Sequence, residues 1–182
     1  MQRYNVLFLC TGNSARSIMV EAIMNKKGFP KFTAYSAGSH ATGRVHSQAL
    51  RQLEIAKLPT QGLHSKNLDE FATPGAPELH FVLTVCDNTA KEVCPIWPGQ
   101  PMTAHWGVPD PAAVSGSLEQ IERAFRDAFM TLERRISFLF VPTAFWPRQT
   151  SHSEENRRHW PPMKPLASLR NFSGRDFSLQ PS

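Results

Sequence analysis

Apolar and polar residues follow two different spacings along the chain, and each spacing predicts one kind of element. Short, nearly continuous apolar runs are typical of buried parallel strands, whereas apolar residues at three- and four-residue steps are typical of a helix with one buried face. The pattern predicts, in chain order, a strand at Tyr4–Leu9, a helix at Arg16–Lys27, a strand at Phe32–Ser36, a helix at His46–Leu53, a short helix around Asn67–Phe71, strands at His80–Val85 and Thr103–Trp106, and a long helix from Leu118 to Ile136.

Strands that alternate with helices predict an α/β fold with parallel strands, because each parallel connection needs a crossover that a helix can supply. We expect three layers: an open parallel sheet of four strands, with helices flanking it. The carboxyl ends of such strands meet at one edge of the sheet, where ligands bind. The loops that directly follow the strands are therefore the places to look for chemistry.

The pattern ends near residue 141. The segment 142–182 contains six prolines and two tryptophans, set among arginine, serine and histidine residues without a repeating apolar face. We predict one α/β domain at residues 1–141, followed by a Pro-, Ser- and Arg-rich C-terminal extension at 142–182 with little order. A docking segment for a partner is the alternative interpretation of this extension.

The net charge of +5 belongs mainly to the extension and does not predict a nucleic-acid partner. Residues 142–182 carry six Lys or Arg against three Asp or Glu, so that the first 141 residues carry only +2. No apolar run approaches the ~20 residues of a membrane span, and no N-terminal signal sequence is visible. We expect a soluble, cytoplasmic protein with neither nucleic acid nor a membrane as a partner.

The strongest motif is Cys-Thr-Gly-Asn-Ser-Ala-Arg-Ser at residues 10–17, between the first strand and the first helix. The backbone N–H groups of such a loop converge on one spot at the positive end of the helix dipole, where an oxyanion binds. Arg16 can hold two oxygens with its planar guanidinium, and the same groups should lower the pKa of Cys10 and make it a nucleophile. A buried structural cysteine is the alternative. The expected oxyanion-binding residues are Thr11, Gly12, Asn13, Ser14, Ala15, Arg16 and Ser17.

The chain has three cysteines, an odd number that is typical of reactive thiols in a reducing compartment rather than of a disulfide framework. Cys86 follows a predicted strand, as Cys10 does; if the two strands are neighbours, a modest loop movement can bring the sulfurs together. Cys94 lies eight residues further on. The alternatives are that Cys86 and Cys94 are ordinary semi-buried residues, or that they bind zinc with histidines, although their spacing is not that of a structural zinc site.

Asp110 lies between two prolines after the last predicted strand, and therefore on the same edge of the sheet as Cys10. A carboxylic acid there can protonate a departing oxygen, which is general acid catalysis. A plain turn residue is the alternative, because Asp-Pro is common in turns. Five histidines lie on unrelated elements and are interpreted as surface or core residues: His40, His46, His64, His80 and His105.

Three motifs together resemble the low-molecular-weight tyrosine phosphatase family, over about residues 4–136: Cys10 with Arg16-Ser17, Ser36-Ala37-Gly38 after the second strand, and Asp110-Pro111. Within this family, Thr84-Val85-Cys86, Cys94-Pro95 and the segment from His105 to Pro111 resemble the arsenate reductase branch. A phosphatase of the family usually has an aromatic residue after its Asp-Pro, whereas this chain has Ala112 at that position.

The resemblance to arsenate reductases implies a relay of three thiols for arsenic detoxification. Cys10 would attack arsenate with Asp110 as the acid, Cys86 would attack Cys10 and release arsenite, and Cys94 would carry the disulfide outward. The implied reductant is thioredoxin, with glutaredoxin, glutathione or another low-molecular-weight thiol as alternatives, and no tightly bound cofactor is implied. Phosphate and sulfate are expected to compete with arsenate for the loop.

The family also has members that hold a potassium ion beside the loop, and Asn13, Glu21 and Ser36 match part of that site. The sequence offers no assignable remaining ligand, and no other metal is implied. Two other functions stay open. One is a phosphatase that hydrolyses phosphate monoesters through a phosphocysteine and needs only Cys10, Arg16 and Asp110; the other is a non-catalytic module that binds an oxyanion or senses oxidation through its thiols.

Overall fold

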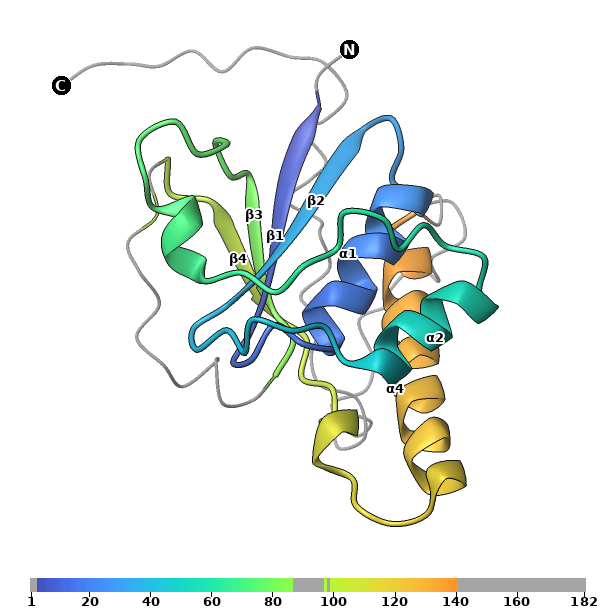
Figure 1. Cartoon of the computed structure of the whole chain (residues 1–182). Coiled ribbons are helices and arrows are strands. Elements are labelled where there is room, and N and C mark those ends of the chain that lie inside the picture. The colour runs from blue at the N-terminus through green and yellow to red at the C-terminus, as the bar shows by residue number, and fades with distance from the viewer. Residues whose placement is uncertain (1–2, 87–96, 98, 141–182) are drawn as a thin grey trace, which may run out of the picture. The chain divides into compact units, whose positions relative to one another are not determined.

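The computed structural model describes residues 3–86, 97 and 99–140 (Figure 1). These residues form four strands, three α-helices and two short 3₁₀ helices. In chain order they are β1 (Tyr4–Cys10), α1 (Arg16–Lys27), β2 (Phe32–Gly38), α2 (Ser47–Ile55), a 3₁₀ helix at Leu68–Phe71, β3 (Phe81–Thr84), β4 (Met102–His105), a 3₁₀ helix at Pro111–Ala113, and α4 (Leu118–Leu139). The predicted elements are all present, with ends that differ by a few residues.

The four strands form one parallel sheet in the order β2-β1-β3-β4. Cys10, the last residue of β1, is paired with Gly38 of β2, and Leu9 is paired with Thr84 of β3. The carboxyl ends of the strands thus meet at one edge, and the segments that carry Cys10 and Cys86 leave from neighbouring strands. The predicted open parallel sheet of four strands with flanking helices is confirmed.

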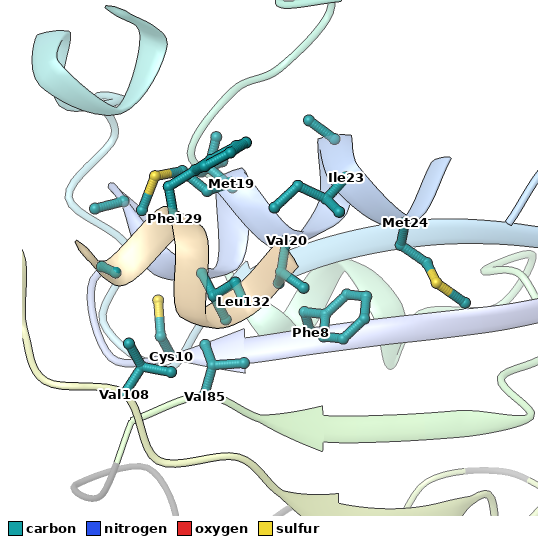
Figure 2. Close-up of a cluster of buried hydrophobic side chains, with 14 of the residues drawn as sticks. Phe8, Cys10, Met19, Val20, Ile23, Met24, Val85, Val108, Phe129 and Leu132 are labelled. Atoms are coloured by element: carbon teal, nitrogen blue, oxygen red, sulfur yellow. The ribbon is translucent and has the colours of Figure 1, made fainter. Parts of the chain in front are cut away.

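Alternate residues of β1 pack into two cores, one on each face of the sheet, as the period of a strand requires. Phe8 and Cys10 lie on the face covered by α1, α2 and α4. Figure 2 shows the side chains of Met19 from α1 and Leu132 from α4 packed over this face, above Phe8 and Cys10. Leu7 and Leu9 point to the other face, where they pack with Phe71, Leu79, Val82 and Trp97.

The long helix α4 forms because its start is capped and its apolar positions recur at three- and four-residue steps. The Ser117 side chain accepts the Gln120 N–H, and the Gln120 side chain in turn accepts the Ser117 N–H, which makes a capping box. The buried positions are Phe125, Ala128, Phe129, Leu132 and Ile136. Helix α4 closes the core that holds Cys10.

No helix in the described part of the chain is long and apolar enough to cross a membrane. The predicted extension at 142–182 and the third cysteine, Cys94, lie outside the described residues. The boundary at residue 141 and the low order of the extension therefore stay predictions.

Candidate active site

The loop between β1 and α1 is held from outside by a second loop, residues 39–46. Four backbone N–H groups of residues 39–46 donate to four backbone carbonyls of residues 10–14, at distances of 2.8–3.2 Å. The four hydrogen bonds run from Ser39 to Cys10, from His40 to Thr11, from Thr42 to Gly12 and from His46 to Ser14.

This arrangement turns the N–H groups of residues 11, 12, 13 and 15 toward the inside of the loop, where an anion can bind. In a trans peptide the N–H points away from the C=O of the same plane, so a carbonyl directed outward leaves the next N–H directed inward. The peptide between Gly12 and Asn13 illustrates the rule: the Gly12 carbonyl accepts from Thr42, and the Asn13 N–H donates to Cys10 Sγ at 3.2 Å. The loop is therefore built as a cradle of inward N–H groups around the sulfur.

A pocket of about 270 Å³ opens above this loop. Arg16, whose side chain is 11% exposed, forms part of its wall; its Nη2 lies 2.9 Å from Asp110 Oδ2, and its Nη1 donates to the Val108 carbonyl at 2.9 Å. The structure thus brings Cys10, Arg16 and Asp110 together. The residues that line the pocket are Cys10, Thr11, Gly12, Ser14, Ala15, Arg16, Thr42 and Asp110.

Asp110 uses its two carboxylate oxygens for different purposes. Oδ1 accepts the Ala112 N–H and caps the 3₁₀ helix Pro111–Ala113, while Oδ2 pairs with Arg16. Asp110 is therefore a turn residue through Oδ1, as the alternative interpretation held, but it also lines the pocket and pairs with Arg16 through Oδ2. Its role as a general acid stays a prediction.

Cys10 is 3% exposed, and its sulfur lies next to hydrogen-bonding groups of the loop and of α1. It lies 2.9 Å from the Ser17 hydroxyl and accepts the Asn13 N–H. Burial nevertheless raises the pKa of the Cys10 thiol above its ordinary value, because these hydrogen bonds lower it by less than burial raises it. The expected lowering of the pKa is wrong for this arrangement, in which Cys10 lies under α1 and α4 and Arg16 is engaged with Asp110.

Asn13 connects the loop to the rest of the fold. It is buried and adopts a left-handed backbone conformation with φ 43°, which asparagine tolerates better than most residues. Its Nδ2 donates to Ser17 at 2.8 Å and to Ser36 at 2.9 Å, and its Oδ1 accepts the Lys66 N–H at 2.7 Å. One side chain thus links α1, β2 and the segment that follows α2.

Glu21 and Lys66 form a buried ion pair next to Asn13. Lys66 Nζ lies 3.5 Å from Glu21 Oε2, and the same oxygen accepts the Ser36 hydroxyl. Burial raises the pKa of Glu21, and the Lys66 ammonium opposes that rise. Lys66 was not among the residues suggested by the sequence, because a lysine in a segment broken by proline and glycine is ordinarily exposed.

The three residues matched to a potassium site do meet here, but their oxygens are committed to other partners. Asn13 Oδ1 accepts from Lys66, and Asn13 turns its Nδ2, a donor, toward Ser36. The Glu21 carboxylate faces an ammonium group. The residues as arranged do not fit a potassium ion, and no cluster of three or more His, Cys, Asp or Glu suited to a metal occurs among residues 3–86, 97 and 99–140.

Cys86 lies just beyond the end of β3 and is 2% exposed. Its Sγ lies 3.5 Å from the hydroxyl of Thr11 in the loop. The expectation that Cys10 and Cys86 follow neighbouring strands is confirmed. A second sulfur therefore stands beside the cradle, and the position of Cys94 relative to it lies outside the described residues.

Two further residues near the site were not suggested by the sequence. Thr42 lines the pocket from residues 39–46, and Arg135 of α4 donates to the Gly107 carbonyl at 3.1 Å, in the segment that carries Asp110. Neither stands in a motif, because both reach the site through tertiary packing. The five histidines interpreted as surface or core residues have contacts outside the pocket. His46, for example, caps α2 and stacks on Phe125 with ring centres 4.5 Å apart.

Comparisons with known proteins agree with this geometry. The model of the family described as low molecular weight phosphotyrosine protein phosphatase matches residues 5–149. An arsenate reductase of Halalkalibacterium halodurans is 32% identical over 136 residues, which are 75% of this chain and 94% of the relative.

Two solved structures are similar in fold as well. An arsenate reductase in the phosphate-binding state aligns with a TM-score of 0.62 and 25% identity, over 75% of this chain and 95% of that one. An arsenate reductase of Archaeoglobus fulgidus aligns with a TM-score of 0.58 and 27% identity, over 74% of this chain and 97% of that one.

Proposed function

The chain belongs to the low molecular weight phosphotyrosine protein phosphatase family, and we propose that within this family it reduces arsenate to arsenite. The observation that carries the proposal is the second buried thiol, Cys86, which stands 3.5 Å from the Thr11 hydroxyl at the edge of the anion loop. Hydrolysis of a phosphate ester needs one nucleophile. Reduction needs two electrons, and a pair of thiols supplies them.

In the first step the loop holds arsenate through its N–H groups and Arg16, and Cys10 attacks arsenic. The thiol proton and the Asp110 proton neutralise the oxygen that departs as water, and a Cys10 S–As bond replaces an As–O bond. Because burial raises the pKa of the Cys10 thiol, its proton must be accepted as the sulfur attacks, and the dianionic arsenate can serve as that base. Phosphate and sulfate have the same tetrahedral shape and compete for the loop.

In the second step Cys86 attacks Cys10 Sγ. An S–S bond forms, the S–As bond breaks, and its electron pair stays on arsenic, which leaves as arsenite. Two thiols are thereby oxidised to one disulfide while arsenic(V) is reduced to arsenic(III). The pairing of β1 with β3 supports this step, because it holds the two sulfur-bearing segments on adjacent strands.

In the third step Cys94 attacks Cys86 and exposes the disulfide to an external reductant. We assign this reductant to the class of dithiols to which thioredoxin belongs, with glutaredoxin, glutathione or another small thiol as alternatives. Such reductants belong to a reducing compartment such as the cytoplasm. Arsenic resistance is the corresponding physiological role.

A phosphatase that acts on phosphate monoesters is the second candidate, since Cys10, Arg16 and Asp110 alone meet its needs. Ala112, directly after Asp110-Pro111, argues against phosphotyrosine, because it offers no ring to stack on the substrate. The comparisons do not support this candidate better than the reductase.

The decisive experiment follows arsenate-dependent NADPH oxidation with thioredoxin and its reductase, for the wild type, Cys86→Ser and Cys94→Ser. Multiple turnovers are expected from the wild type alone. A single-turnover assay on Cys94→Ser should still yield one arsenite and one Cys10–Cys86 disulfide per protein, which mass spectrometry detects. The proposal is wrong if no dithiol supports turnover by the wild type while the wild type and Cys86→Ser hydrolyse an aryl phosphate equally well.

A further inference from the structure

Lys66 is buried directly behind the anion loop, at 8% exposure. Its Nζ donates to the His64 carbonyl at 3.2 Å and faces Glu21, which is also 8% exposed. An ammonium group withdrawn from water is costly unless it is paired, and a buried pair is rarely the most stable choice for a core. We therefore expect the role of the Lys66 ammonium group to lie in the contacts that it makes.

We propose that Lys66 is a positioning residue for Cys10: its ammonium group occupies the place of a bound monovalent metal ion, balances the charge of Glu21, and so anchors the hydrogen-bonded chain that runs from Glu21 to the sulfur. The proposal concerns the loop on which the proposed function rests, but it requires no arsenate chemistry.

The contacts define this chain one hydrogen bond at a time. An ionised Glu21 can only accept, so the single hydroxyl proton of Ser36 points to it. Ser36 Oγ must then accept from Asn13 Nδ2. The other Nδ2 proton of Asn13 goes to Ser17 Oγ, which leaves the Ser17 hydroxyl proton for Cys10 Sγ at 2.9 Å.

The polarity of this chain matters for the sulfur. A hydroxyl that donates to Cys10 stabilises the thiolate, whereas one that accepts from it stabilises the thiol. Lys66 also fixes Asn13 directly, because its backbone N–H donates to Asn13 Oδ1 at 2.7 Å. The Asn13 amide donates both of its protons, so its direction toward Ser17 does not depend on the ammonium group. Loss of the ammonium group would instead leave the buried charge of Glu21 unbalanced and would loosen the chain where it is anchored behind the loop.

The first test measures Cys10 itself, in a background where Cys86→Ser and Cys94→Ser leave it as the single thiol. The pH midpoint of its alkylation by iodoacetamide is compared between Lys66→Met and Lys26→Met, an exposed lysine of α1 that serves as the matched control. We expect Lys66→Met to raise the midpoint by about one pH unit and to weaken phosphate binding about tenfold, and Lys26→Met to change neither. Equal midpoints in the two variants would overturn the proposal.

The second test uses the wild type and needs no variant to fold. Thermal unfolding and phosphate binding are measured in potassium chloride and in tetramethylammonium chloride at the same ionic strength. We expect the same Tm and the same Kd for phosphate in the two salts, because the Lys66 ammonium group supplies the cation. A Tm several degrees higher in potassium would mean that a metal ion is needed and that Lys66 does not replace it. Neither test depends on reduction, so failure here is distinct from failure of the reductase assay.

Discussion

Gly38, at the end of β2, is the position where one methyl group should damage the anion loop most directly. A Cβ at Gly38 would lie 2.6 Å from the Thr11 carbonyl oxygen and 3.0 Å from the backbone N of Asn13. Both neighbours are backbone atoms and cannot rotate away. In Gly38→Ala the loop must therefore move by about 0.5–0.8 Å to restore an ordinary contact.

That displacement carries two measurable costs. Overpacking of a tight core costs about 1–3 kcal/mol, which corresponds to a Tm lower by roughly 3–10 °C in a chain of this size. Phosphate binding should weaken more than stability alone suggests, by about 10- to 100-fold, because a misplaced cradle loses several hydrogen bonds to the oxyanion together. Isothermal titration with phosphate measures the second cost.

Gly62→Ala is the control that separates the two effects. Nothing lies within 4 Å of a Cβ at Gly62, but its φ of 84° strains any residue with a side chain. The control should lose about 1 kcal/mol of stability and keep its phosphate affinity. If Gly38→Ala binds phosphate within twofold of the wild type, the loop tolerates the methyl group and the geometric reasoning is refuted.

Three further outcomes are expected. Arg16→Lys should bind phosphate at least tenfold more weakly with little change in Tm, because an ammonium group cannot hold two oxygens as the planar guanidinium does; unchanged affinity would contradict this. Asp110→Asn should slow formation of the Cys10–Cys86 disulfide by about 10²- to 10⁴-fold in single turnover with arsenate, while phosphate still binds. The raised pKa of Cys10 means that its burial favours folding below the ordinary thiol pKa and that this contribution is lost as pH rises through the folded value; Cys10→Ala should therefore lose less stability than the wild type between neutral and alkaline pH, by chemical denaturation.

The strands and the anion loop could be predicted because their sequence signals report local structure. The apolar run before Cys10 is a buried strand, and the Gly, Asn and Ser residues after it are the residues that a tight turn into α1 requires. Cys86 could be predicted at the same edge because it also follows an apolar run. The local sequence was enough to predict the position of a site residue wherever that residue directly follows a strand.

Lys66 and the pKa of Cys10 could not be predicted, because both depend on packing between distant elements. The buried Lys66 is paired with Glu21 of α1, and no repeating pattern in the sequence connects residue 66 with residue 21. The sequence showed which groups could donate to Cys10. It did not show that Phe129 and Leu132 of α4 pack into the same buried cluster as Cys10 (Figure 2). Burial, the larger influence on the thiol, was therefore missed.

The segment 39–46 that holds the anion loop contributes backbone N–H groups, so evolution can rewrite most of its side chains without touching the cradle. His40 and Thr42 are exposed, and Thr42 lines the mouth of the pocket. Substitutions of these exposed side chains could alter which oxyanion enters while the cradle below stays unchanged. Proline, which lacks the N–H, is barred at residues 39, 40, 42 and 46. Selection can thus change the entry of the oxyanion through residues 39–46 without changing the reactive cysteine in the loop at residues 10–17.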